Sequence, residues 1–266
     1  MTLDLSAYLK RIEFAGSPSA SVADFQKLHL AHATHIPFEN LDILLGRPIR
    51  IDLESIQAKL VHARRGGYCF EQNQLFAAVL QNLGLKTTYL AARVRFRVQK
   101  TLPRTHVLLL VEIDGDNWIA DVGFGTVGIL EPMPLIERQE SFQYGWTYRF
   151  IRIEGTWILQ SLQKDGWLDL YGFTLEPQEF VDLEMANHYV STFPQSRFVQ
   201  TLTAQTSTTA ERRLLRNFDL IIDRGGESVT TTLRDQDELL SVLAEQFDLH
   251  FTAGTRFQIA GAFGTG

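Results

Sequence analysis

Between Gly84 and Lys86 the hydrophobic pattern of the chain changes from a helical period to a strand period. Before this point apolar residues recur at steps of three and four, as in amphipathic helices. These windows are Leu5–Leu9, Val22–Leu30, Ile56–Leu60 and Phe70–Leu83. After it the apolar runs are short and rich in β-branched and aromatic residues, with turn signals between them. The predicted strands are 87–96, 106–113, 117–124, 148–155, 156–162 and 167–173. The pattern predicts a mixed α+β fold, with helices followed by an antiparallel meander or barrel.

The last third of the chain is predicted to combine strands with one closing helix. We interpret 201-TLTAQTSTT-209 as a Ser/Thr-rich connection. The predicted strands after it are Asp219–Asp223 and Ser228–Leu233. Asp235 and Glu238 have capping-box spacing ahead of an apolar helical stripe that ends at Phe247. Because no linker rich in Pro and Gly separates these parts, we expect them to pack as one body.

Charge and apolar runs limit the partners that this chain can have. It carries 25 Lys and Arg against 31 Asp and Glu, a net charge of -6, which disfavours nucleic acid and anionic membranes. The longest strongly apolar run, 107-VLLLV-111, is far shorter than the roughly 20 residues of a membrane-spanning helix. One cysteine cannot form an internal disulfide, and the amino-terminal residues do not match a secretory signal. We expect a cytoplasmic monomer or homodimer that binds a small molecule.

The only cysteine, Cys69, lies in 65-RGGYCFEQN-73, at the start of a predicted helix. Gly66 and Gly67 permit a sharp turn with positive φ before it. Free N–H groups and the helix dipole at a helix start stabilise an anion such as a thiolate. A lone cysteine is more often a small buried hydrophobe than a nucleophile. Its place in this chain favours a nucleophile, provided that a base lies nearby.

A predicted hairpin supplies a candidate base and a candidate carboxylate. Its strands are 105-THVLLLVEI-113 and 117-NWIADVG-123. A two-residue loop at Asp114-Gly115 pairs position 106 with 123, which places His106 and Asp121 diagonally on one face. A loop with an odd number of residues, or a β-bulge, would instead place the two side chains on opposite faces. Taken singly, His106 is more typical of a buried core histidine, and Asp121 of a carboxylate that caps a turn or forms an ion pair. Together with Cys69 they predict a Cys-His-Asp constellation.

Neither a metal site nor a phosphate loop is predicted. His29 and His32 could share a helix face, but His35 falls off it, and no Cys, Asp or Glu at ligand spacing completes a set. The segment 123-GFG-125 matches neither the Walker A pattern nor G-x-G-x-x-G. The candidate chemistry is therefore that of the cysteine.

Taken together, these segments resemble the arylamine N-acetyltransferase family over essentially the whole chain. The resemblance rests on 36-IPFENLDI-43, 65-RGGYCFEQN-73, 105-TH-106, 121-DVGFG-125 and 191-STFPQSRF-198, in this order. It implies a helical domain (1–85), a β-barrel domain (86–190) and an α/β lid (191–266). A papain-like Cys-His-Asp triad would form between the first two.

The resemblance also implies roles for single residues. Cys69 would be the nucleophile, His106 its imidazole partner and Asp121 the orienting carboxylate. Glu39 and Arg65 would form an ion pair that ties the IPFEN segment to the turn before the cysteine. The implied reaction is a ping-pong transfer of acetyl from acetyl-CoA, through acetyl-cysteine, to an arylamine, hydrazine or hydroxylamine, with no metal.

Further residues are assigned by the same resemblance to the two substrates. The residues implied to face the CoA cleft are Thr105, Gly123, Phe124 and Phe198. We expect glycine there to let backbone N–H groups approach phosphate oxygens. Phe38 and Phe124 are candidate aromatic walls for an arylamine, although Phe38 is equally typical of a plain core residue.

Two other readings stay open from the sequence. A Cys-His-Asp triad also serves amide synthases and hydrolases of the papain or transglutaminase kind. A non-catalytic protein that binds acyl-CoA could keep the same fold. Acetylation of the cysteine separates the transferase from both.

Overall fold

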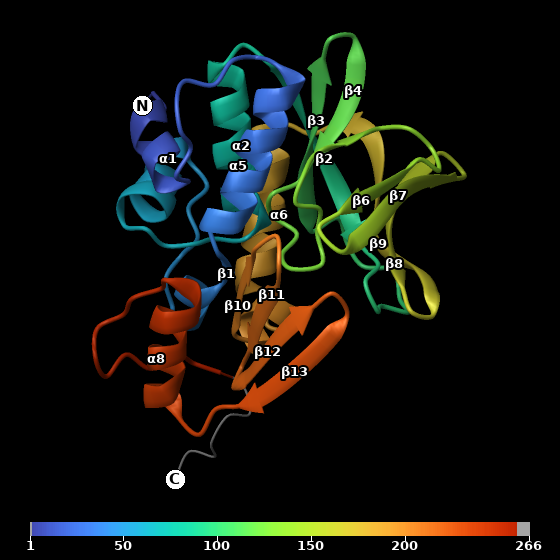
Figure 1. The fold of residues 1–266 in the computed structure, drawn as a ribbon. Coiled ribbons are helices and arrows are strands. Elements are labelled where there is room, and N and C mark those ends of the chain that lie inside the picture. The colour runs from blue at the N-terminus through green and yellow to red at the C-terminus, as the bar shows by residue number, and fades with distance from the viewer. Residues whose placement is uncertain (1, 260–266) are drawn as a thin grey trace.

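A helical block forms the first part of the computed structural model, which describes residues 2–259 (Figure 1). Its elements are α1 (Leu5–Arg11), α2 (Val22–His35), β1 (Phe38–Glu39), α3 (Leu41–Leu44), α4 (Leu53–Ile56), the π-helix η1 (Gln57–His62) and α5 (Cys69–Asn82). Each predicted helical window matches one of these helices or a pair of them, except that Leu83 is the C-cap after α5, so the helical prediction is confirmed. None of the helices within residues 2–259 combines the length and apolar character needed to cross a bilayer.

The middle of the chain forms an antiparallel sheet of eight strands that curls into a nearly closed barrel (Figure 1). Its strands are β2 (Lys86–Val94), β3 (His106–Ile113), β4 (Asp116–Ala120), β5 (Met133–Pro134), β6 (Glu140–Gln143), β7 (Trp146–Ile153), β8 (Thr156–Gln163) and β9 (Gly166–Pro177). Their order in the sheet is β5-β4-β3-β2-β9-β8-β7-β6. The predicted barrel is thus confirmed in its coarse form. The strand predicted to reach residue 124 ends at Ala120, so the chain from Asp121 onward is free to turn.

The second sheet lies at the other end of the molecule, where β10 (Thr203–Ser207), β11 (Arg212–Arg216), β12 (Asp219–Arg224) and β13 (Glu227–Thr232) join β1 beside α8 (Gln236–Phe247) (Figure 1). The chain reaches this sheet through α6 (Phe180–Thr192), which packs on the core of the helical block, and α7 (Arg197–Gln200). The predicted Ser/Thr-rich connection is wrong, because most of it is strand β10, inserted between β1 and β11. The closing helix is confirmed: Asp235 caps α8 by accepting from the N–H groups of Asp237 and Glu238. Residues 260–266 lie outside the described part.

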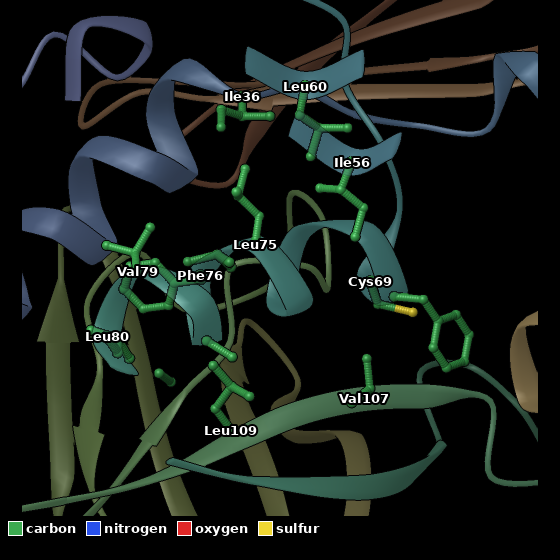
Figure 2. Close-up of a cluster of buried hydrophobic side chains, with 14 of the residues drawn as sticks. Ile36, Ile56, Leu60, Cys69, Leu75, Phe76, Val79, Leu80, Val107 and Leu109 are labelled. Atoms are coloured by element: carbon green, nitrogen blue, oxygen red, sulfur yellow. The ribbon is translucent and has the colours of Figure 1, made fainter. Parts of the chain in front are cut away.

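The hydrophobic core between α5 and the barrel fixes where the helix begins. Leu75, Phe76, Val79 and Leu80 on α5 share one buried cluster with Val107 and Leu109 on β3. Figure 2 shows Cys69 at the end of this row, above Val107. Fully burying a side chain of this size contributes about 2 kcal/mol. The packing therefore holds the first turn of α5 against the first residues of β3.

A buried network of charges joins the segment around β1 to the turn before α5. Arg65 donates to Glu39 Oε1 from Nε and Nη2, at 3.0 and 2.6 Å, which confirms the predicted ion pair. Lys59 Nζ lies 3.0 Å from Asp42 Oδ2 and 2.7 Å from Glu71 Oε1. Glu71 Oε2 in turn accepts the N–H of Tyr68 at 3.1 Å. The network closes the turn that precedes Cys69.

We predict that Glu39→Gln lowers the free energy of unfolding by about 3 kcal/mol, because the buried Arg65 loses the nearer of its two carboxylate partners and keeps only Asp42. Glu39 also accepts the N–H of Leu41 at 2.7 Å, so an amide cannot satisfy both donors with oxygen. Urea unfolding at constant m-value measures the change. The control is Glu112→Gln, which removes the exposed pair with Lys86 and is expected to cost less than about 1 kcal/mol. Equal losses in the two variants would contradict the prediction.

Candidate active site

Cys69 is the first residue of α5 and is buried, as the helix-start prediction requires. Its Sγ lies 3.8 Å from the carbonyl oxygen of Thr105. Neither Gly66 nor Gly67 has the positive φ that we expected. Both are needed for close approach instead, since a Cβ on Gly66 would lie 2.1 Å from Pro37 O and one on Gly67 would lie 2.6 Å from Glu71 Oε2.

His106 and Asp121 lie on one face of the β3–β4 hairpin, as predicted. The loop is Asp114-Gly115, and the register pairs Leu109 with Ala120. This register is the expected one. His106 Nε2 lies 2.7 Å from Asp121 Oδ2, and both side chains are buried. Cys69 Sγ lies beside the residue before His106, at the Thr105 carbonyl, and the thiol helps to raise the pKa of the same imidazole. The three predicted residues thus lie close together where α5 meets the start of β3, and their action as a triad stays a prediction.

The carboxylate decides the charge of the imidazole. Burial alone would lower the pKa of His106, but the charge and hydrogen bond of Asp121, together with contact to Cys69, raise that pKa from 6.5 to about 10. Burial opposes ionisation of Asp121 as well, yet His106, Asn73 and the Gly123 N–H hold the pKa of Asp121 below its usual value. At neutral pH the site therefore contains an imidazolium and a carboxylate.

Three residues that the sequence reasoning did not assign to this task hold Asp121 in place. Asn73 Nδ2 donates to Asp121 Oδ1 at 3.0 Å, and Gly123 N donates to the same oxygen at 3.0 Å. His29 Nε2 accepts the backbone N–H of Asp121 at 3.0 Å. Asn73 lies four residues after Cys69 in α5, so its position on the same helix face was a usable signal. His29 is 92 residues away from Asp121, and no local pattern indicates that contact.

Gly123 also explains how closely the helix approaches the hairpin. A Cβ at this position would lie 2.7 Å from Cys69 Cα and 2.8 Å from Asn73 Nδ2. Its N–H is already donated to Asp121. The glycine is therefore required where α5 meets the end of the hairpin, and its N–H orients the carboxylate rather than pointing to a phosphate.

His29 and His32 are neutral core residues with fixed tautomers. His29 Nδ1 donates to Leu130 O at 2.8 Å, which leaves Nε2 as the acceptor for Asp121. His32 bridges Tyr8 OH and Gln72 Oε1, at 2.9 and 2.8 Å. Burial lowers the pKa of His29 to about 4 and that of His32 to about 3. Within residues 2–259 no group of three His, Cys, Asp or Glu side chains could hold a metal ion.

We predict that acid destabilises the protein through these two histidines. The unfolded chain takes up protons near pH 6.5, whereas the folded chain does not until pH 4 or below, so stability is present above pH 6.5 and is lost as pH falls. His29 alone contributes about 3 kcal/mol between pH 6.5 and 4. Unfolding free energies of His29→Gln should show a flatter slope across this range. His250→Gln, at an exposed side chain, should keep the slope of the parent, and a parallel flattening there would argue against this assignment.

Aromatic residues assigned to the substrates lie in two groups around the triad. The Phe124 ring packs edge-on against His106 at 5.0 Å and against Tyr171 at 4.8 Å. Phe198 packs against Phe38 at 6.0 Å and against Tyr68, the residue before Cys69, at 5.6 Å. Tyr171 and Tyr68 were not predicted as part of the site.

Phe38 and Phe124 also line one small cavity, of about 20 Å³. It has room for about one water molecule, and neither Cys69 nor His106 borders it. It lies between α2, β10 and the loop that follows Asp121. This space is therefore too small for an aromatic ring and lies beneath the loop, not at the sulfur.

The arrangement is suited to nucleophilic acyl transfer. A buried thiol touches an imidazole that a carboxylate orients and keeps protonated, and this is the pattern of activated cysteine nucleophiles. What remains to be identified is the acyl donor and the acceptor.

Comparisons with known proteins address the family. A family model described as N-acetyltransferase matches residues 21–256. The arylamine N-acetyltransferase of Escherichia coli (strain K12) is 38% identical over 252 residues, covering 94% of this chain and 90% of that protein. The structure of Nocardia farcinica arylamine N-acetyltransferase has a TM-score of 0.89 and 41% identity, covering 94% of this chain and 90% of that one.

A further solved structure includes a ligand. Mycobacterium marinum arylamine N-acetyltransferase in complex with CoA has a TM-score of 0.88 and 33% identity, covering 92% of this chain and 93% of that one. Sequence and fold thus agree over nearly the whole chain. The chain belongs to the arylamine N-acetyltransferase family.

Proposed function

We propose that this chain transfers the acetyl group of acetyl-CoA to arylamines, and by the same chemistry to hydrazines or hydroxylamines, through a ping-pong mechanism. The observation that carries the proposal is the contact series from Cys69 through His106 to Asp121, at the meeting point of α5 and the barrel. A relative named arylamine N-acetyltransferase and a relative solved with CoA support the choice of donor and acceptor.

In the first half-reaction the Cys69 thiolate attacks the carbonyl carbon of the acetyl thioester. The tetrahedral intermediate collapses with cleavage of the bond between carbon and the CoA sulfur, and the His106 imidazolium donates its proton to that sulfur. The products are free CoA and acetyl-Cys69, with His106 neutral. Asp121 keeps the imidazole in one orientation through Nε2, which leaves Nδ1 for the cysteine.

In the second half-reaction the amine nitrogen attacks the acetyl-cysteine carbonyl. Neutral His106 takes the proton that the nitrogen loses, and Cys69 leaves as a thiolate beside the imidazolium that has been restored. A thioester intermediate suits this step because transfer from one thioester to another is nearly balanced in energy. The acetyl group thus stays activated for a weakly nucleophilic aromatic amine.

The residues around the triad are assigned to the substrates by their contacts. Thr105 borders the sulfur through its carbonyl group, and Phe198 packs against Tyr68 next to the cysteine, so we assign both to the CoA cleft. We place Gly123 at the edge of the same cleft, because it has no side chain that would occupy the space. Phe124, against the catalytic imidazole, forms a wall for the aryl ring and borders CoA, and Phe38 supports this wall from below.

Several features stay predictions from the sequence and the family. They are the division into a helical domain (1–85), a barrel domain (86–190) and a lid (191–266), the cytoplasmic location, and the monomeric or homodimeric state. Size-exclusion chromatography with light scattering decides between the two states.

Intact-mass analysis tests the proposed function directly. Incubation with acetyl-CoA should add one acetyl group to the protein, on the peptide that contains Cys69, and a subsequent arylamine should remove it and appear as its amide. Loss of the acetyl group to water alone, or peptide cleavage with no adduct, would favour a hydrolase. Binding of CoA with no adduct would favour a non-catalytic binding protein.

A further inference from the structure

The loop of residues 122–130, which follows Asp121, is held in place by side chains from distant parts of the chain. One backbone hydrogen bond lies within it, from Gly128 N to Gly125 O at 2.9 Å. Apart from Asp121 itself, the side chains that bind its backbone come from α2, α5, β6, β7, β10 and β11, and they are His29, Asn73, Gln143, Tyr148, Gln205 and Arg212. The small cavity described above is lined in part by this loop. The position of the loop therefore depends on these side chains.

Arg212 on β11 makes the largest number of these contacts. Its Nη1 donates to Thr126 O, and its Nη2 donates to Gly128 O at 3.3 Å and to Tyr148 OH at 2.6 Å. The guanidinium lies 3.7 Å from the centre of the Trp146 ring. Tyr148 OH itself donates to Gly128 O at 2.8 Å, so two side chains converge on that carbonyl.

No carboxylate within residues 2–259 lies at ion-pair distance from the Arg212 guanidinium. The residue is buried, with 4% exposed, and the carboxylate that acts on its charge is that of Asp223, its partner on β12. Burial of a guanidinium whose direct partners are all neutral acceptors is costly. A neutral side chain of similar length could fill the same space over Trp146. The hydrogen bonds to the loop are what the arginine adds.

These contacts reach the reaction site through Phe124. Thr126 is two residues after Phe124, and Gln205 Oε1 accepts the Thr126 N–H at 2.7 Å, so both backbone polar groups of Thr126 are bound by side chains of the second sheet. Phe124 is the residue of the loop whose ring contacts the catalytic His106. A shift of the loop would therefore move the aromatic wall relative to the imidazole.

We propose that Arg212 is a positioning residue that fixes the 122–130 loop from the second sheet and, through Phe124, determines which acceptor amines are used. The effect on acceptors rests on the proposed transferase function. The effect on the loop does not. The second sheet thus takes part in acceptor selection through a side chain that touches no substrate.

A double-mutant cycle tests the coupling to acceptor choice. The variants are Arg212→Met, Phe124→Leu and their combination, and the measured quantity is the ratio of kcat/KM for a bicyclic arylamine to that for a small hydrazine. Each single variant is expected to change this ratio about fivefold, and the combination is expected to change it no further. Strictly multiplicative effects, or an equal loss for both acceptors, would overturn the proposal.

Arg213→Met is the matched control, from the same strand. The Arg213 side chain binds Glu211 and the carbonyl of Gln246, away from the loop. Its acceptor ratio should equal that of the parent. Arg212→Lys serves as the conservative variant: a lysine can reach one carbonyl but cannot span two, so its ratio should fall between those of the parent and Arg212→Met.

Hydrogen exchange tests the same proposal without any turnover. In Arg212→Met, the amides of residues 122–130 should exchange at least about tenfold faster, while those of α5 keep their protection. Unchanged exchange in the loop would overturn the proposal even in an active enzyme. A parent protein that acetylates no amine would instead count against the transferase function, and the exchange result would still decide whether Arg212 holds the loop.

Discussion

Cys69→Ser is expected to reduce acetyl transfer at least about 10⁴-fold, with a melting temperature close to that of the parent. The hydroxyl of serine fits the space but is not a thiolate, and its acetyl ester would be a much poorer donor than a thioester. The imidazolium of His106, with its pKa of about 10, cannot act as the base that a serine nucleophile needs at neutral pH. Steady-state turnover of an arylamine and intact-mass analysis measure the loss.

Cys69→Ala separates binding from chemistry in the same experiment. Calorimetric titration with CoA should give a dissociation constant near that of the parent, since a thiol contributes little to holding a nucleotide. Turnover should vanish. If the alanine variant still acetylated the arylamine, another group would have to carry the acetyl, and the proposal that Cys69 is the nucleophile would be wrong. If the parent and the variant bound CoA equally and neither turned over, the binding-protein reading would hold.

The places of Cys69, His106 and Asp121 in the fold could be predicted because each depends on a short-range pattern. The two-residue loop at Asp114-Gly115 sets the register of the hairpin, and parity then places His106 and Asp121 on one face. The start of α5 follows from the apolar period of the helix and the glycines before it. The predicted positive φ of Gly66 and Gly67 was wrong. The two glycines are needed because other atoms approach them closely, and only the folded structure shows which atoms these are.

What could not be predicted depends on contacts between distant parts of the chain. Strand β10 reads as a connection because its residues are mainly threonine, serine and glutamine, and it becomes a central strand only by pairing with β1 and β11. Helix α6 was missed because Val181 and Met185 are exposed on it, which blurs its apolar period. The contacts of His29 and Arg212 with the loop after Asp121 likewise arise only when three parts of the chain meet.

Asp121→Asn is expected to reduce the rate of Cys69 acetylation about 10³- to 10⁴-fold at neutral pH. The carboxylate accepts hydrogen bonds from Asn73 and Gly123 at Oδ1 and from His106 at Oδ2. The amide of asparagine has only one oxygen, so it can accept from only one of these two groups of donors. With its oxygen toward Asn73 and Gly123, its NH₂ group faces Nε2 and selects the imidazole tautomer with the proton on Nδ1. The neutral ring then directs N–H rather than a base toward Cys69.

The same substitution should change how the thiol responds to pH. The charge of Asp121 is what raises the pKa of His106 against the effect of burial, so its removal lowers that pKa. In the parent the imidazolium persists up to about pH 10, and alkylation of Cys69 by iodoacetamide should stay fast across neutral pH. In Asp121→Asn the imidazolium is lost at a lower pH, and alkylation near pH 7 should slow by at least about tenfold. Asp116→Asn, an exposed carboxylate on the same hairpin, is the control and should follow the parent. Parallel profiles for all three proteins would show that Asp121 does not set the charge of His106.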